Sequence, residues 1–539
     1  MCRLLSACVA AALAILGGTA PSRSQPLCGT MPYPSSTQTP APILTGQYVW
    51  SFVSEPTLRP MKVATSAFGA GPDPGLAFIA PYAFTADPSV GQQGALILDN
   101  ATPNANPVWF RPAGNVNLMN TDFRVQQFNG KPVLTFWQGT LATPPNYTNV
   151  PAGSSEPGSC FYILDNTYRV IKTVTAQYGF TSDVHEFLLT PSNTALFLST
   201  KSVPMNLTPY GGPRNGYIQD FAIQEIDLNS GRLVFFWDAL NYIPLTNSYE
   251  PASSATSTGN IWDVYHLNSV GLTNSPTDII VSGRNLWTIY RINKPTGQIV
   301  WQLGGKQSNF TFGSGATFSW QHDARFLPNN VVSMFDDNCC ESQTVPPRTP
   351  PSHALYLQLN LSNMTASLAT QYFLDANLHV ESQGNTQTLS DGHVFVGWGQ
   401  SQYFSEFAPG GNTIADPSMN LLYKATMPSI DLGNNKTATD YTYRAYRETW
   451  VGKPYYPPVI AAVQGHGQTT IYASWNGATE VKTWQIFSVS FNGAIPVASA
   501  AKSGFETAIT VPGAGGYFQA RALDAHGTVL GVSAATLSH

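Results

Sequence analysis

The sequence of 539 residues has few charged residues and no run rich in Ala, Glu, Lys and Leu that would favour a long helix. Charged residues make up 11% of the chain and aromatic residues 12%, and 45 glycines with 41 prolines supply frequent turns. This composition favours β-strands and predicts an all-β protein. The net charge of -5, without a basic stripe that carries aromatic residues, argues against nucleic acid as a partner.

Long apolar runs are missing everywhere except near the N-terminus, where residues 4–16 form one. Arg3 precedes this run and the small residues 17–20 follow it, a pattern typical of an export signal. We expect residues 1–24 to be a signal peptide that is removed. The run is shorter than the ~20 apolar residues that cross a bilayer, so we expect no membrane span. The predicted location is secreted or extracellular, or periplasmic if the host is a Gram-negative bacterium.

Cysteines are also few, and four remain beyond the signal: Cys28, Cys160, Cys339 and Cys340. An even number suits an oxidising compartment and allows three disulfide connectivities. Because a bond between adjacent cysteines is strained, we interpret Cys339 and Cys340 as partners of Cys28 and Cys160. Seven Asn-x-Ser/Thr sites would be glycosylated in a eukaryotic host, namely Asn100, Asn146, Asn206, Asn309, Asn360, Asn363 and Asn435.

An approximate repeat follows the polar N-terminal lead of residues 25–44. Each unit has about four short strands separated by turns, and four units open with a histidine: His185, His266, His322 and His379. These histidines lie 81, 56 and 57 residues apart. Units of this size with four strands are typical of a β-propeller. About six units fit between residues 45 and 452, so the sequence predicts a six-bladed β-propeller there.

A different and smaller unit ends the chain. Residues 453–459 are rich in proline and form a stiff linker. Residues 460–539 contain alternating strands, with Trp475 early and an aromatic-led strand late, as in a fibronectin-III or immunoglobulin-like β-sandwich. We interpret this unit as a module for packing or attachment that has no chemistry of its own.

The recurring histidines are the candidate site. The innermost strand of each propeller blade lines the central channel, so a residue that recurs at the start of this strand points to the axis from every blade. A single histidine in a strand is more often a packed residue than a catalyst, but recurrence at one position predicts that the four histidines face one another. No Gly-x-x-x-x-Gly-Lys loop is present to hold a phosphosulfate nucleotide.

Five motifs together resemble the arylsulfotransferase family, and most closely the branch common in fungi and some bacteria. They are Asp183-Val184-His185-Glu186-Phe187, Tyr265-His266-Leu267-Asn268-Ser269, Ser282-Gly283-Arg284, Trp301-Gln302-Leu303-Gly304-Gly305-Lys306 and Trp320-Gln321-His322-Asp323-Ala324-Arg325. The resemblance extends over about residues 45–535. It implies a six-bladed propeller that transfers a sulfuryl group from a phenolic sulfate ester to a phenol, with no nucleotide donor and no cofactor.

The resemblance also implies a role for each candidate residue. His322 would be the nucleophile that forms a sulfo-histidine intermediate. Arg284 offers a fork of donors suited to sulfonyl oxygens. His266 would exchange protons with the phenols, with Asn268 beside it on one face of a strand, and His185 would help to hold the sulfuryl oxygens.

Two other classes of function fit the same residues. The four histidines could bind a divalent metal for lyase or hydrolase chemistry, or the propeller could bind phenolics or glycans without catalysis. Our leading prediction needs a phenolic sulfate donor and a phenolic acceptor, and it assigns no metal ligand. The identity of donor and acceptor and the oligomeric state are left open.

Overall fold

The computed structural model describes residues 48–83, 90–114, 118–140, 158–257, 259, 261–338, 350–433, 436–513 and 515–539. These residues form 37 β-strands. The helices in this part of the chain are five short 3₁₀ helices, η1 (Thr208–Tyr210), η2 (Ala239–Asn241), η3 (Leu245–Asn247), η4 (Ala252–Ser257) and η5 (Pro328–Asn330). The all-β prediction is confirmed. Within the described ranges, no helix has the length and apolar character needed to cross a membrane.

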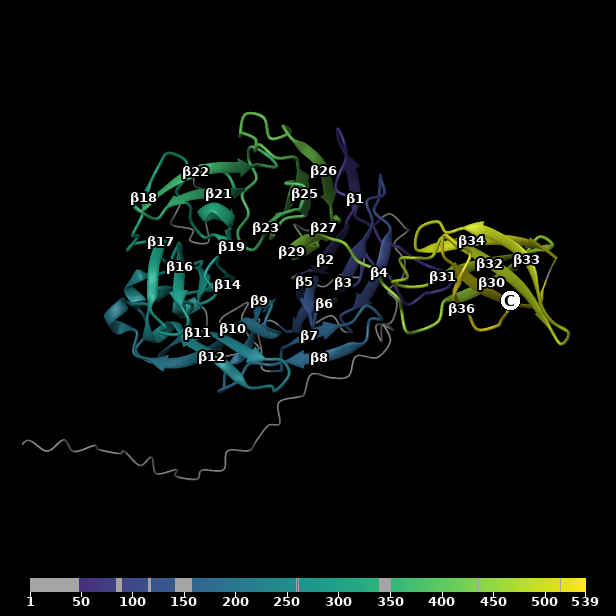
Figure 1. Ribbon diagram of the computed structural model, residues 1–539, viewed down its shortest axis with the longest axis horizontal. Coiled ribbons are helices and arrows are strands. Elements are labelled where there is room, and N and C mark those ends of the chain that lie inside the picture. Colours follow the sequence, from purple (N-terminus) through teal and green to yellow (C-terminus); the bar gives the residue numbers. More distant parts are fainter. Residues whose placement is uncertain are drawn as a thin grey trace, which may run out of the picture.

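Six sheets follow one another around a ring, which Figure 1 shows as a propeller. The first sheet has β29 (Tyr441–Glu448), β2 (Leu76–Tyr82), β3 (Gly94–Leu98) and β4 (Pro107–Pro112). The second has β5 (Met119–Phe128), β6 (Lys131–Gly139), β7 (Cys160–Leu164) and β8 (Val170–Val174). The third has β9 (Thr181–Leu189), β10 (Thr194–Met205), β11 (Gly216–Asp227) and β12 (Leu233–Asp238), with β13 (Ile261–Trp262) beside β11.

The other three sheets have the same plan. The fourth has β14 (Leu267–Leu272), β15 (Asp278–Gly283), β16 (Thr288–Asn293) and β17 (Ile299–Gly304). The fifth has β19 (His322–Leu327), β20 (Val331–Asp336), β21 (His353–Asn360) and β22 (Thr365–Tyr372), with β18 (Thr311–Phe312) at its edge. The sixth has β23 (Asn385–Thr388), β24 (Val394–Gly397), β25 (Tyr403–Phe407), β26 (Leu421–Thr426) and β1 (Ala64–Ala67). Each of these sheets has the consecutive antiparallel strand order of a propeller blade.

Strands distant in the sequence close the ring. β29 pairs antiparallel with β2 and becomes the innermost strand of the first sheet, while β1 pairs with β26 at the outer edge of the sixth. Closure in this way leaves few free strand edges within the ring. The innermost strands are therefore β5, β9, β14, β19, β23 and β29.

Most of the inner strands contain a β-bulge near the axis. The pairing register shifts between Thr121 and Arg124, between Leu267 and Ser269, and between His322 and Arg325. A bulge adds one residue to a strand and changes the direction of the neighbouring side chains. As a result, polar residues that are close in the sequence can point to the channel together.

A buried guanidinium joins these inner strands. The side chain of Arg444 in β29 is fully buried, and its Nη1 lies 2.9 Å from Asp122 Oδ1 and 3.1 Å from Glu186 Oε2. Its Nε lies 3.3 Å from Asp323 Oδ1, and its Nη2 donates to the carbonyl of Asn268 at 2.9 Å. One side chain of β29 thus contacts β5, β9, β14 and β19.

Two further arginines balance the charge at this point. Arg124 lies 2.5 Å from Glu186 and 3.1 Å from Asp122, and Arg325 lies 2.7 Å from Glu186 and also contacts Asp323. Burial alone would raise the pKa of Glu186, but the charges of Arg325, Arg444 and Arg124 outweigh burial and lower that pKa to about 2. We call these three arginines, with Asp122, Glu186 and Asp323, the axial charge cluster.

The C-terminal residues form a β-sandwich. One sheet has β30 (Val459–Gly465), β31 (Gln468–Ser474) and β34 (Glu506–Pro512), and the other has β32 (Thr483–Ser490), β33 (Gly493–Ala501), β35 (Tyr517–Leu523), β36 (Val529–Val532) and β37 (Thr536–Leu537). Ile471, Trp484 and Phe518 lie in the core that the two sheets share. The separate hairpin of β27 (Ser429–Gly433) and β28 (Lys436–Thr439) precedes the closing strand.

The sandwich is fixed to the propeller through β4. The amide of Asn476 accepts a hydrogen bond from the N–H of Phe110 at 2.9 Å and donates one to its carbonyl at 2.8 Å. The hydroxyl of Tyr168 donates to the carbonyl of Gly477 at 2.8 Å. Figure 1 shows the sandwich beside the ring at this position.

Some predictions fall on residues outside the described part of the chain. They are the signal peptide and the positions Cys28, Cys339, Cys340, Asn146 and Asn435. Cys160 takes part in a disulfide. The pairing of the four cysteines remains a prediction.

Replacement of Arg444 by methionine is expected to lower the free energy of unfolding by about 3–5 kcal/mol, because it leaves buried carboxylates without their cation. Chemical denaturation followed by tryptophan fluorescence measures the change. Arg214→Met is the matched control, because Arg214 is exposed. Equal stabilities of the two variants would contradict a stabilising role for the axial charge cluster.

Candidate active site

Three of the four predicted histidines meet near the axis of the propeller. His185 lies in β9, His266 directly precedes β14, and His322 begins β19. The ring centroids of His185 and His266 are 4.9 Å apart, and those of His266 and His322 are 6.4 Å apart. Three consecutive blades therefore bring their opening residues to one site.

The prediction that His379 joins this site is wrong. His379 is exposed and lies outside the strands, because β23 starts only at Asn385. The chain of the sixth blade reaches the site at Gln383, whose N–H donates to His322 Nε2 at 3.2 Å. Gln383 and Gly384 have φ angles of 74° and 96°, and this left-handed turn directs the backbone inward. The spacing of 57 residues between His322 and His379 continues the series in the sequence, but it does not place His379 at the start of the inner strand β23.

Each of the three histidines is oriented by a carboxylate. The pairs are His185 Nδ1 with Asp183 Oδ1 at 2.5 Å, His266 Nδ1 with Asp263 Oδ2 at 2.5 Å, and His322 Nδ1 with Asp337 Oδ2 at 2.7 Å. A carboxylate at Nδ1 holds the proton on that nitrogen and fixes the ring. The Nε2 atoms are left to face the site. No local motif predicts Asp337, because it follows β20 and lies 15 residues from His322.

His322 is a buried and neutral imidazole. Its side chain is 1% exposed, and burial, followed by the charge of Arg284, lowers its pKa well below the usual value of 6.5. The ring is therefore neutral near pH 7. Because Asp337 accepts from Nδ1 and the Gln383 N–H donates to Nε2, the lone pair of the ring lies on Nε2.

His185 and His266 share a proton. Their Nε2 atoms are 3.2 Å apart, although both Nδ1 atoms already face carboxylates. Two lone pairs at this distance would repel, so one Nε2 carries a hydrogen. Burial lowers the pKa of His185, and we assign the proton to His266. Burial would raise the pKa of Asp263, but the charge of His266 and its hydrogen bond lower it.

Arg284 is fully buried beside these rings. Its Nη2 donates to the carbonyl of Glu381 at 2.7 Å, its Nη1 donates to Asn285 Oδ1 at 3.2 Å, and its guanidinium lies 5.0 Å from the ring centroid of Trp320. Asn285 also donates to the carbonyl of Asp263 at 2.5 Å. Asn285 thereby connects Arg284 to the segment that orients His266.

The side chain of Asn268 contacts the backbone next to His322, at the carbonyl of Gln321. Its Nδ2 donates to the carbonyl of Gln321 at 2.7 Å, and the bulge after Leu267 separates it from the face of His266. Its Oδ1 is buried and accepts no hydrogen bond from the described residues. The structure brings Asn268 to the backbone that carries His322.

Tyr443 is a residue of the site that sequence reasoning missed. Its ring centroid lies 5.5 Å from that of His185 and 6.5 Å from that of His322. Its hydroxyl is buried without a hydrogen-bond partner in the described chain, and burial raises its pKa well above 10. It is thus a neutral donor. Tyr443 lies on β29 and reaches the site only because β29 pairs with β2 and closes the ring, so no local motif indicates it.

Among the described residues, no group of three or more histidine, cysteine, aspartate or glutamate side chains is arranged to hold a metal ion. The described residues thus give the metal-dependent alternative no support.

A family model described as arylsulfotransferase (ASST) matches residues 124–418, more than half of the chain. The chain belongs to the arylsulfotransferase family. The matched segment contains all five residues predicted for the site, namely His185, His266, Asn268, Arg284 and His322. The resemblance seen in the motifs is confirmed. Membership of the arylsulfotransferase family implies a sulfotransferase that acts on phenolic substrates.

Other comparisons show more distant likenesses. No curated protein matches the chain. A protein of unknown function from Bacteroides caccae is 11% identical, with a TM-score of 0.36, and the alignment covers 70% of this chain and 100% of that one. A protein from Lactobacillus plantarum is 11% identical, with a TM-score of 0.31 and coverages of 69% and 98%. The Cps50 (Swd1) β-propeller domain of Myceliophteria thermophila is 10% identical, with a TM-score of 0.29 and coverages of 63% and 91%.

The lowered pKa of His322 predicts a pH effect on stability. Below pH 6.5 the unfolded chain binds a proton at His322 while the folded chain does not, so the wild type loses stability relative to His322→Gln as the pH falls. The difference should grow by up to about 1.4 kcal/mol per pH unit. Denaturation of both proteins between pH 7 and pH 5 measures it. A difference that is constant with pH would contradict the neutral, buried ring.

Proposed function

We propose that the protein is an exported aryl sulfotransferase in which His322 carries the sulfuryl group between two phenols. The observation that carries the proposal is the buried neutral imidazole of His322, whose Nδ1 is held by Asp337, whose Nε2 accepts from the Gln383 N–H, and whose ring lies near that of His266 and within the electrostatic influence of Arg284. The catalytic unit would be the propeller of residues 45–452. The linker of residues 453–459 and the sandwich of residues 460–539 would form a separate structural module.

In the first step the lone pair of His322 Nε2 attacks the sulfur of an aryl sulfate ester. The bond between Nε2 and sulfur forms, and the bond between sulfur and the phenolic oxygen breaks with its electron pair on that oxygen. The proton of His266 Nε2 then neutralises the phenolate. This leaves a sulfo-histidine at His322 and a neutral phenol that can depart.

The second step is the reverse with a different phenol. His266 Nε2 takes the proton of the acceptor hydroxyl, and the acceptor oxygen attacks the sulfur. The new bond between sulfur and oxygen forms while the bond between sulfur and Nε2 breaks, and its electron pair returns to His322. The side chain of His266 is 23% exposed, whereas that of His322 is 1% exposed. His266 therefore offers the side on which phenols enter and leave.

Several donors surround the place of the sulfuryl oxygens. The N–H of Gln383 already lies 3.2 Å from His322 Nε2, so it is close to any oxygen on a sulfur bonded there. The cation of Arg284 and the hydroxyl of Tyr443 complete the set. The Nε2 of His185 accepts from His266 in this state, so His185 supports the site through His266 and does not donate to the sulfuryl oxygens. Fixed donors in a buried site stabilise the charge that spreads over the oxygens in the transition state.

Asn268 acts here through His322. Its hydrogen bond to the Gln321 carbonyl holds the turn where Trp320 has a φ of 59° and His322 follows. We assign Asn268 a positioning role, and the paired action with His266 on one substrate is not part of the proposal.

Replacement of His322 by glutamine is expected to reduce transfer from a chromogenic aryl sulfate to a phenol below detection, because the nucleophile is removed. The far-ultraviolet circular dichroism should stay that of the wild type. His526→Gln is the matched control, since His526 is exposed in the sandwich. Undiminished transfer by the His322 variant would refute the assignment of the nucleophile.

Replacement of Asp337 by asparagine keeps the size of the side chain but no longer holds the proton on Nδ1 of His322. We expect the rate constant for transfer to fall by about 10²–10⁴-fold, as for other histidines that lose the carboxylate fixing their tautomer. Steady-state kinetics with the same substrates measures this. A loss confined to KM, with an unchanged kcat, would argue against this role.

A further inference from the structure

The central channel has a second mouth, opposite the histidines. A cavity of about 670 Å³ lies there, within the range of small-molecule sites. Each of the six inner strands contributes to its lining, through Arg124 of β5, Leu189 of β9, Leu272 of β14, Leu327 of β19, Thr388 of β23 and Glu448 of β29. The histidines stand at the starts of these strands and the cavity at their ends. The axial charge cluster separates the two mouths.

Most of the charge in this lining is already neutralised. Arg124 is held by Asp122 and Glu186, and Arg325 by Glu186 and Asp323. The other oxygen of Asp323 accepts from the N–H of Thr386 at 3.2 Å. Arg444 completes the cluster behind them, so three cations face three carboxylates. The cluster therefore presents no net charge to the cavity.

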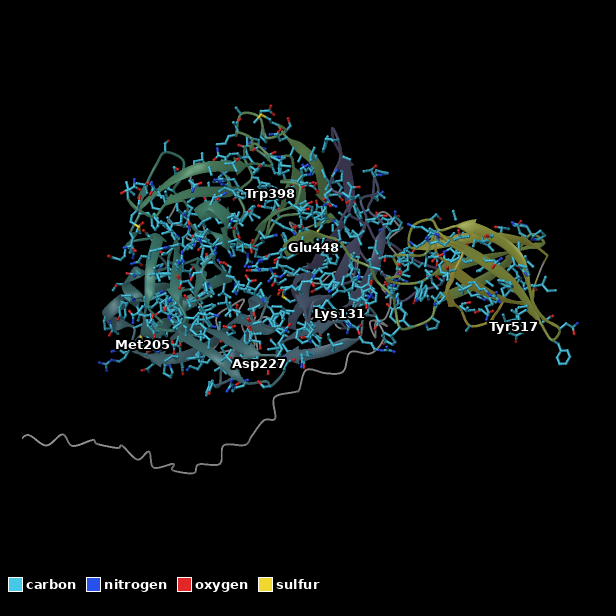
Figure 2. The ribbon with its side chains drawn as sticks, in the orientation of Figure 1. Lys131, Met205, Asp227, Trp398, Glu448 and Tyr517 are labelled. Carbon is cyan, nitrogen blue, oxygen red and sulfur yellow. The ribbon has the colours of Figure 1, made fainter. Side chains whose placement is uncertain are left out.

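Glu448 is the exception. One oxygen of its carboxylate accepts a hydrogen bond from the amide of Gln387 at 2.9 Å, and in the described chain it forms no ion pair. Figure 2 labels Glu448 on the inner side of the ring. The remaining lining includes the apolar residues Leu188, Leu189, Pro191 and Leu272 together with polar residues such as Thr388. The cavity thus contains a carboxylate that has no ion-pair partner in the described chain, together with several apolar side chains.

We propose that this second mouth binds a small organic cation, with an ammonium group on Glu448 and an apolar group against the leucines. A carboxylate that is largely buried is costly without a cationic partner, and an ammonium ion supplies the missing charge and the hydrogen bonds. An anionic ligand is disfavoured, because it would meet Glu448 while both arginines keep their own carboxylates.

The protonation of Glu448 gives the binding a pH dependence. Burial, the main cause, and the charge of Asp73 raise the pKa of Glu448 to about 7, against the opposing influence of Arg124 and Gln387. The other ionisable groups that face the cavity are Arg124, Arg325, Asp323 and Tyr446. The arginines stay charged in their ion pairs, and burial raises the pKa of Tyr446 above its usual range. Between pH 6 and pH 8 the ionised fraction of Glu448 rises about tenfold, and affinity for a cation should rise equally.

The probe for the test is 2-phenylethylammonium, which keeps its charge over this range, and 2-phenylethanol is the neutral counterpart. Titration calorimetry with the full chain should show saturable binding of the ammonium compound, about tenfold tighter at pH 8 than at pH 6, and a pH-independent response to the alcohol. Absence of binding at both pH values, or equal affinity at both, would overturn the proposal.

Glu448→Gln should remove the pH dependence and weaken binding of the ammonium compound about tenfold or more at pH 8. Glu480→Gln is the matched control, because Glu480 lies in the sandwich beside Lys453. Identical behaviour of the two variants would refute the role of Glu448. If Glu448→Gln does not fold, the pH series on the wild type still decides. Sulfuryl transfer is not needed for this binding, so the result is independent of the transferase assay.

Discussion

The ion pairs of Arg444 are the interaction on which the arrangement of the propeller axis depends. The closing strand β29 brings this guanidinium to the centre, where it contacts carboxylates of β5, β9 and β19 and a carbonyl of β14. A buried charge is tolerated only with such partners. The inner strands are therefore held in one register, and with them the histidines at their openings.

This cluster also divides the channel into two chemically different ends. At one end lie three imidazoles, each fixed by an aspartate at Nδ1; the Nε2 atoms of His185 and His266 face each other, and the Nε2 of His322 accepts from the Gln383 N–H. Their differing surroundings separate their tasks, because His322 is buried and neutral while His266 keeps contact with solvent. At the other end the carboxylate of Glu448 forms no ion pair with the residues that the structure describes. Both ends are built from the inner strands of the same ring.

The sequence predicted the repeat, the all-β fold and the convergence of His185, His266 and His322, because a residue that opens successive inner strands must reach the axis. It did not predict Asp337, Gln383 or Tyr443, which come to the site through strand pairing, a left-handed turn and ring closure. His379 was misplaced for a related reason: its spacing continued the series, but the sixth inner strand begins later. Contacts made by closure leave no local signal in a sequence.

The central claim is that His322 forms a covalent bond to sulfur, and mass spectrometry of the protein after brief exposure to an aryl sulfate without acceptor tests it most directly. The account predicts one added sulfuryl group, about 80 Da, on the peptide that contains His322. The group should disappear when a phenol is added, with formation of the new aryl sulfate. An adduct on a different residue, or transfer at full rate with no adduct in rapid-quench samples, would contradict the account.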